Sequence, residues 1–556
     1  MKITDTGDLW WKTAIVYCLD VKTFLDWNDD GVGDFPGLAQ RIDYLASLGV
    51  TCLWLMPVHP SGGVDDGYDP IDFYAVDERL GSLGDFVEMV RVARDRGIRV
   101  VIDLVVQHTS DRHPWFQKSR ESTQSPFRDF YIWRTDCPPQ SPQDSAFPGD
   151  EDGVWDRDEK TGEYFRHQFY TREPDLNLTN PRVRDEIAKL AGFWLQLGIS
   201  GFRVDAVPFL LSGEDPNASA GELHSYLRAL RAFLSRRQGD ALLLGEVNLD
   251  RKEQVEYFGG DDADELNMQF DFVGMQAMYL ALARQSSEPL RQALIGRPKL
   301  IADSQWANFV RNHDELTLDK LTDAEREEVF AAFGPEERMQ AYGRGLRRRL
   351  PPMLGGDQAR IRMVYSLLFA LPGTPVLFYG EEIGMGENLD APGRLAVRAP
   401  MQWSGSSPNG GFSNADASQL VAPVVPGEFG PENVNVEAQR TDPDSLLAFI
   451  TRLTHRYREC PELGWGEATV VDHPNPAVLV LVNRWDDSGM VTIHNFSADE
   501  LEVELELDWV PQGTRLADLL DDHGLELGDG GRVTLPLEGY GFRWLRIATP
   551  GGRRLQ

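Results

Sequence analysis

The chain has 556 residues, 42% of them hydrophobic, so it is too long for one ordinary domain and can bury a large core. It carries 88 Asp and Glu against 55 Lys and Arg, a formal net charge of −33, which disfavours nucleic acid and anionic membranes as partners and favours a neutral or cationic substrate. The four cysteines are scattered, and no signal peptide or apolar run of transmembrane length is recognisable, so we expect a cytoplasmic protein with free thiols.

Eight short apolar segments alternate with helical patterns along most of the chain. Helical spacing of apolar residues covers 38–48, 86–93 and 181–197. Such alternation predicts a parallel sheet buried on both faces, and eight strands over this length favour a closed (β/α)8 TIM barrel, in which chemistry gathers at the carboxyl ends of the strands. The predicted strands are 15–17, 51–56, 99–104, 201–206, 241–246, 266–270, 306–310 and 375–379.

Two long interruptions and one change of pattern divide the chain further. Residues 109–175, after the third strand, are rich in Asp, Pro and aromatic residues and predict an inserted domain. Residues 322–360 predict a helical excursion, with helices at 325–333 and 342–350. From 463 to 556 apolar and polar residues alternate, which predicts a C-terminal antiparallel β-sandwich. The barrel is then 1–108 and 176–462, and both interruptions are expected to cover its mouth.

Three acidic residues directly follow predicted barrel strands: Asp205 the fourth, Glu246 the fifth and Asp314 the seventh. Taken alone, Arg203 and Asp205 are more often a structural ion pair. Three carboxyl groups at the same rim of the predicted barrel favour a shared catalytic role over three separate structural roles. They can cleave an acetal, because one attacks the anomeric carbon, a second protonates the leaving oxygen and a third stabilises the developing charge. Crowded negative charge also raises the pKa of one carboxyl group, which keeps the acid protonated.

Residues 103–108, 201–205, 245–246 and 312–314 resemble the four ordered signature regions of the α-amylase family, glycoside hydrolase family 13. The resemblance implies a retaining mechanism with Asp205 as nucleophile, Glu246 as general acid/base and Asp314 as transition-state stabiliser. It implies no organic cofactor. The substrate-binding residues that it implies, with Arg203 orienting Asp205 and Tyr68 as a stacking platform, are Asp65, Tyr68, His108, Arg203, His313 and Arg398.

Within that family, residues 9–465 are most similar to the branch that isomerises maltose to trehalose, which implies a glucosyl-Asp205 intermediate and a neutral disaccharide substrate. The sequence departs from that branch at Gln107, at Val247 and over 390–397. The departures leave an α-glucosidase or an intermolecular α-transglucosidase as alternatives. A non-catalytic relative is less favoured because the carboxylates are kept, and a homo-oligomer is left open.

A loop rich in Asp and Asn predicts a metal site. Asp26, Asn28, Asp30 and Asp34 offer side-chain oxygens at positions 1, 3, 5 and 9 of an EF-hand-like loop, and Val32 offers a carbonyl at position 7. The closing glutamate is missing, so by composition alone an Asx-rich turn fits nearly as well. The resemblance to the family's calcium loop favours structural calcium, with magnesium as the alternative.

The resemblance also implies a second calcium at the base of the insertion, held in relatives by an asparagine, an aspartate and a glutamate. Here Gln107 replaces the asparagine, Asp175 is the aspartate, and Ser212 stands in place of the glutamate. Because glutamine is one methylene longer and the glutamate's charge is lost, we expect no ion there. A hydrogen bond from Gln107 or a nearby cationic side chain would then join the insertion to the barrel.

Overall fold

The structure is a computed structural model that describes residues 9–147, 151–210, 220–301, 303–507, 509–510, 514–521, 524–528 and 531–548. Ser212 lies outside the described residues. The chain forms two compact units. The first includes Cys18–Asp43 and Cys52–Phe270, and the second includes Trp10–Tyr17, Tyr44–Thr51 and the chain from Asp271 onward.

Eight parallel strands form a closed barrel in the order β1-β14-β10-β9-β8-β7-β3-β2, as the sequence predicts. Nearly every strand residue is buried, which explains why these segments are continuously apolar rather than alternating. The strands are β1 (Val16–Leu19), β2 (Cys52–Leu55), β3 (Arg99–Leu104), β7 (Gly201–Val204), β8 (Leu242–Gly245), β9 (Met268–Phe270), β10 (Gln305–Phe309) and β14 (Thr374–Phe378).

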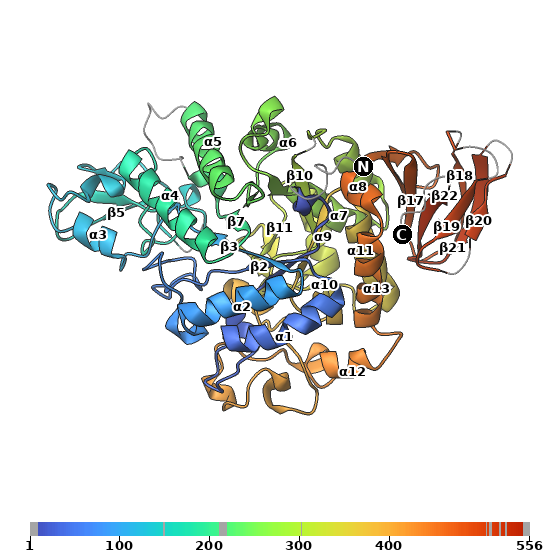
Figure 1. The fold of residues 1–556 in the computed structure, drawn as a ribbon, viewed down its shortest axis with the longest axis horizontal. Coiled ribbons are helices and arrows are strands. Elements are labelled where there is room, and N and C mark those ends of the chain that lie inside the picture. Colours follow the sequence, from blue (N-terminus) through green and yellow to red (C-terminus); the bar gives the residue numbers. More distant parts are fainter. Residues whose placement is uncertain are drawn as a thin grey trace. The chain divides into compact units, whose positions relative to one another are not determined.

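Several of the helices between the strands begin at side-chain caps. Ser82 and Asp85 form a capping box at the start of α2, and Asn180 accepts a hydrogen bond from the Arg182 amide at the start of α4. Helices α1 and α2 lie side by side (Figure 1), with the Phe35 and Phe86 rings 5.3 Å apart. The helices are α1 (Phe35–Leu48), α2 (Leu83–Asp95), α4 (Pro181–Gln196), α5 (Ala220–Arg237), α6 (Arg251–Gln254), α7 (Phe272–Arg284), α8 (Glu288–Ile295), α11 (Gln358–Ala370), α12 (Val436–Arg440), α13 (Leu446–Arg458) and α14 (Pro461–Trp465).

The inserted segment folds around a small antiparallel sheet in the order β4-β6-β5. The sheet consists of β4 (Trp133–Arg134), β5 (Trp155–Arg157) and β6 (Tyr164–Arg166), and α3 (Pro114–Ser119) precedes it. The ring of Phe116 on α3 contacts those of Tyr131, Trp133 and Phe165. The backbone amide of Leu176 donates to the Gln107 carbonyl at 2.9 Å, so the end of the insertion is hydrogen-bonded to the segment after β3.

The excursion at 322–360 is only partly helical. The predicted helix at 325–333 is present, but the prediction of a helix at 342–350 is wrong. Helix α9 (Asp323–Phe333) corresponds to the first of these, and it begins at a Thr322–Glu325 capping box. Residues 342–350, predicted as a helix, instead contain a hairpin turn between β12 (Gln340–Ala341) and β13 (Gly345–Leu346), and β13 also pairs with β11 (Leu316–Thr317). Tyr342 and Gly343 have φ of 54° and 63°, which reverses the chain and cannot continue a helix. Helix α10 (Leu350–Met353) follows.

The C-terminal strands form an all-β body (red in Figure 1), which confirms the predicted antiparallel β domain. A six-stranded sheet has the order β15-β16-β17-β22-β19-β20, and β18 pairs with β21 in a second sheet. Apolar side chains of both sheets, among them Val480, Val491, Leu505 and Leu535, form one core. The strands are β15 (Glu467–Val471), β16 (Val478–Trp485), β17 (Ser488–Asn495), β18 (Leu501–Glu506), β19 (Arg515–Asp518), β20 (Gly524–Glu526), β21 (Arg532–Leu537) and β22 (Phe542–Ala548).

Candidate active site

Arg203 joins two of the predicted catalytic carboxylates in the first unit. It is the third residue of β7 and is almost completely buried. Its Nη1 lies 2.5 Å from Asp205 Oδ1, and its Nη2 lies 2.6 Å from Glu246 Oε2. Asp205 follows β7 and Glu246 follows β8, so two neighbouring parallel strands bring both carboxyl groups to one guanidinium. Burial lowers the pKa of Arg203, but its carboxylate partners more than offset this and the pKa is raised well above the usual value.

A third carboxylate, Asp103 on β3, completes the same network, although the sequence assigned it no role. Its Oδ1 lies 3.3 Å from Arg203 Nη1 and accepts a hydrogen bond from Trp54 Nε1 at 3.0 Å. Its Oδ2 accepts from the Tyr68 hydroxyl at 2.8 Å. Burial raises the pKa of Asp103 to about 6, and Arg203 counteracts part of this effect. One cation therefore serves three carboxyl groups, which favours the binding of a proton among them.

The predicted substrate residues Tyr68 and His108 lie beside this network. The Arg203 guanidinium is 5.8 Å from the centre of the Tyr68 ring. His108 is buried, with Nε2 2.7 Å from the Tyr68 carbonyl and Nδ1 2.7 Å from the Gln107 side chain. Burial lowers the pKa of His108, which favours the neutral ring. Asp65 is half-buried, and its carbonyl accepts from the Tyr68 amide at 2.9 Å.

The second unit surrounds Asp314, which follows β10, with basic side chains. Its Oδ2 lies 3.1 Å from His313 Nε2, and its Oδ1 accepts a hydrogen bond from Arg398 Nη2 at 3.1 Å. Arg398 Nε also donates to the His313 carbonyl at 2.9 Å, so one guanidinium fixes both residues. The three predicted residues of this unit thus lie together.

Arg394 is a further partner of Asp314 that the sequence analysis did not identify. It lies in a 3-10 helix (Gly393–Val397), and its Nη1 donates to Asp314 Oδ1 at 2.7 Å. Arg394 precedes Arg398 by four residues in the stretch 390–397, which the sequence singled out only as a departure from related enzymes. The signal in the sequence that could have identified Arg394 was its position, about one helical turn before Arg398, which was predicted to bind the sugar.

The oxygen-rich loop at 26–34 has donor chemistry that fits calcium. Asp26 and Asp34 are buried, and each accepts two backbone hydrogen bonds. Burial raises the pKa of Asp34, and the charge of Asp26 contributes to the rise, so the two carboxylates lie close enough to repel. Asn28 and Asp30 are exposed, and each caps a backbone amide within the loop. A hard cation would relieve the repulsion between Asp26 and Asp34.

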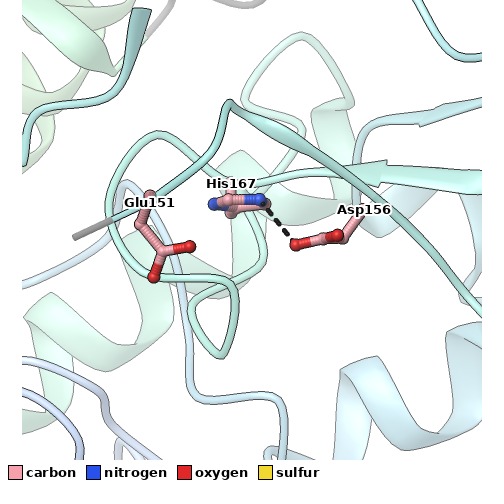
Figure 2. A group of neighbouring side chains, drawn as sticks. All are labelled: Glu151, Asp156 and His167. Atoms are coloured by element: carbon pink, nitrogen blue, oxygen red, sulfur yellow. Dashed lines mark ion pairs between the residues drawn. The ribbon is translucent and has the colours of Figure 1, made fainter. Parts of the chain in front are cut away.

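A different group of potential metal ligands lies in the insertion. Among the residues that the structure describes, Glu151, Asp156 and His167 are the set of three whose ligand atoms lie within 4.8 Å of one another. Figure 2 shows their side chains converging, with an ion pair between His167 and Asp156. These three residues could hold a metal ion, and the sequence analysis did not identify them.

At the base of the insertion, Arg166 pairs with Asp175. Arg166 Nη1 binds Asp175 Oδ2, and its Nη2 donates to Gln168 Oε1 at 2.6 Å. The other oxygen of Asp175 accepts from the Gln168 amide at 2.9 Å. Both charged side chains are buried. Arg166 is thus a cationic side chain beside Asp175, but both residues belong to the insertion, so this pair does not itself join the insertion to the barrel.

Replacing Arg166 with methionine is expected to loosen the insertion, because Asp175 would stay buried without its counter-charge, at a cost of about 3–5 kcal/mol. The measurement is the rate of limited proteolysis within residues 109–175. Arg157→Met is the matched control, since Arg157 lies on the neighbouring strand β5 and is exposed. Equal cleavage rates in the two variants would contradict the role assigned to Arg166.

No helix among the described residues is long and apolar enough to cross a membrane. This finding agrees with the sequence, in which no apolar run reaches the length of a transmembrane segment.

Comparison with known proteins places the chain among sugar-active enzymes. The family model described as "Alpha amylase, catalytic domain" matches residues 20–332 and 347–466, and "Sucrose hydrolase-like, C-terminal domain" matches 488–546. A trehalose synthase from Pimelobacter sp. is 38% identical over 97% of this chain and 96% of its own. An oligo-1,6-glucosidase from Halalkalibacterium halodurans is 28% identical, with coverage of 88% and 90%. The crystal structure of an α-amylase from H. orenii aligns with a TM-score of 0.78 at 25% identity, over 97% of this chain and all of that one.

Proposed function

The chain belongs to the α-amylase family, glycoside hydrolase family 13, and on this basis we propose that it is a retaining α-glucosyl enzyme that isomerises maltose to trehalose. The observation that carries the proposal is the position of Arg203 between Asp205 and Glu246. Two carboxyl groups that flank one guanidinium lie close together, and retaining enzymes use carboxyl groups only about 5–5.5 Å apart. The 38% identity to a trehalose synthase supports the choice of reaction.

In the first step, an Asp205 oxygen attacks the anomeric carbon of the non-reducing glucose of maltose. The bond from that carbon to the bridging oxygen breaks, and the Glu246 carboxyl group gives its proton to that oxygen. Glucose is released within the site, and a glucosyl ester on Asp205 remains. Arg203 orients Asp205 and balances the charge of the resting carboxylates.

In the second step, the anomeric hydroxyl of the released glucose attacks the anomeric carbon of the glucosyl group that is bound to Asp205. Its proton passes to the Glu246 carboxylate, and the bond to Asp205 breaks to leave an α,α-1,1 linkage. The attack must precede that of water, so the site has to stay closed while the glucose turns. The insertion is the candidate cover, since Phe169 lies in it and its ring is 5.2 Å from that of His108.

Asp314 is proposed as the third carboxylate of the site, because it follows β10 as Asp205 follows β7 and Glu246 follows β8. His313 and Arg398 would bind sugar hydroxyls beside it. Arg394 and Arg398 both donate to Asp314 Oδ1, so they orient its carboxylate. The loop at 26–34 is proposed to hold a structural calcium through Asp26, Asn28, Asp30, Asp34 and the Val32 carbonyl, apart from the catalytic carboxylates.

Incubation with maltose tests the proposal. We expect trehalose as the main product with a minor share of glucose, and we expect added isotope-labelled glucose to enter the product poorly, because the released glucose is recaptured before it exchanges. Separation of the sugars by chromatography gives the ratio. Glucose as the main product would favour an α-glucosidase, and efficient incorporation of the label would favour an intermolecular transglucosidase. No turnover of maltose would contradict all three activities.

A further inference from the structure

The strand pairing of the inserted sheet brings together the polar side chains of Glu151, Asp156 and His167. Asp156 is the middle residue of β5 and pairs with Phe165 on β6. His167 directly follows β6, and its amide donates to the Val154 carbonyl at 2.9 Å, which continues the pairing. Glu151 precedes β5 and completes the group (Figure 2). Asp156 lies in the small sheet and the other two side chains flank its strands, and none of the three belongs to the networks around Arg203 or Asp314.

The orientation of the His167 ring matters most. The side chain is only 2% exposed. Its Nδ1 lies 3.2 Å from the Phe169 carbonyl, which can only accept, so Nδ1 carries a proton. Its Nε2 lies 3.1 Å from Asp156 Oδ2. With Nδ1 protonated, a neutral ring would point the lone pair of Nε2 at the Asp156 carboxylate, and the two would repel. The contact between Nε2 and Asp156 Oδ2 therefore requires a positive charge between these atoms, either a second proton on the ring or a metal ion.

The hydroxyl group of Thr171 also faces more acceptor oxygens than it has protons to donate. Its Oγ1 lies 2.8 Å from Glu151 Oε2 and 2.7 Å from Asp156 Oδ2. One hydroxyl proton can satisfy only one of these carboxylate oxygens. The other oxygen therefore faces an oxygen lone pair at hydrogen-bond distance, a contact that a shared cation would make favourable.

We propose that Glu151, Asp156 and His167 bind a divalent cation of the zinc type, with the Thr171 hydroxyl or a water molecule as the fourth ligand. The imidazole nitrogen is a borderline ligand that suits zinc and its neighbours, and zinc also accepts carboxylate oxygens, whereas calcium and magnesium take oxygen ligands alone. The Nδ1–H bond to the Phe169 carbonyl is the outer contact that metal-binding histidines commonly make. The side chain of Asp156 is 46% exposed, which leaves the ion a path from solvent.

A bound ion would restrain residues 167–171. The Phe169 carbonyl is held by His167, and the Phe169 ring contacts that of His108 at 5.2 Å. The ion would thus fix the backbone that carries the Phe169 ring beside His108, a predicted substrate-binding residue. The metal site itself does not depend on the proposed reaction, because its ligands and the catalytic carboxylates are different residues.

Zinc titration of the full-length protein tests the site. The protein is stripped with a chelator and returned to buffer with excess calcium, so that the loop at 26–34 does not compete, and zinc binding is followed by calorimetry. We expect one site in the wild type and an affinity at least about tenfold weaker in Glu151→Gln and in Asp156→Asn. Asp152→Asn is the matched control, because Asp152 is exposed next to Glu151 but outside the group, and should bind as the wild type does.

Two further readouts keep the test independent of folding and of activity. Cobalt in place of zinc should give visible d–d absorption bands in the wild type but not in Glu151→Gln. Zinc should slow amide hydrogen exchange in residues 167–171 in the wild type and not in that variant. Equal zinc affinity in the wild type, Glu151→Gln and His167→Gln would overturn the proposal. Absence of zinc binding at millimolar concentration would do the same and would assign the positive charge to a proton on His167.

Discussion

Asp205→Asn is expected to lose several orders of magnitude in turnover of maltose while keeping the wild-type fold. The amide oxygen can still accept the hydrogen bond that Asp205 Oδ1 receives from Arg203 at 2.5 Å, so the local structure should survive. The amide cannot form the glucosyl ester, so the double displacement has no first step. Steady-state kinetics with maltose, together with circular dichroism, provide the measurement.

Glu246→Gln separates the roles of the two carboxyl groups. The variant should be inactive on maltose, whose leaving group needs a proton, but should react with α-glucosyl fluoride, whose leaving group does not. A glucosyl enzyme should then accumulate, and mass spectrometry should place the sugar on Asp205. Asp185→Asn is the control for both variants, since Asp185 is exposed on α4. Wild-type activity in Asp205→Asn, with no sugar found on that residue in Glu246→Gln, would refute the assignment.

Arg203→Met is expected to damage both stability and catalysis, because it leaves Asp103, Asp205 and Glu246 without their shared cation. Removing one partner from a buried ion pair costs about 3–5 kcal/mol, and here three carboxylates lose it together. Arg203→Lys should be intermediate, because an ammonium group keeps the charge but cannot make the forked contacts of a guanidinium. Urea unfolding and the kinetics of maltose conversion measure the two effects.

The loss of stability in Arg203→Met should depend on pH in a defined direction. Burial already raises the pKa of Asp103 to about 6 from 3.8, and removal of Arg203 raises it further. Near pH 4 the Asp103 carboxyl group is protonated in both folded proteins, so it contributes little to the difference in stability there. As pH rises above about 6, the wild type can ionise Asp103 beside Arg203 but the variant resists this ionisation, so the stability deficit of the variant grows and should be larger at pH 8 than at pH 4. Arg91→Met, which removes two ion pairs on the exposed face of α2, should remain near the wild type at every pH. A deficit in Arg203→Met that is equally large at pH 4 and pH 8 would contradict the electrostatic explanation.

Local patterns in the sequence were sufficient to predict the barrel. Strands such as β3 and β8 are short apolar runs bounded by polar residues, and a helix such as α4 is marked by Asn180, Pro181 and the apolar period that follows. Both signals are carried by residues within one element. The same reasoning placed Arg203 and Asp205 on one face of a strand, and the structure gives them a direct ion pair.

Contacts between distant segments could not be predicted in this way. Asp103 and Arg203 are 100 residues apart, and Arg394 and Asp314 are 80 apart, so neither pair leaves a periodic signal. The error at 342–350 has a related cause, because β13 gains its partner β11 from outside the excursion, and that pairing outweighs local helical spacing. The sequence by itself determined the order of strands and helices and the chemical types at the strand ends, since both depend on neighbours along the chain. Only the tertiary structure decided which charges share a partner, because the energy of a buried ion pair depends on distance and burial in space.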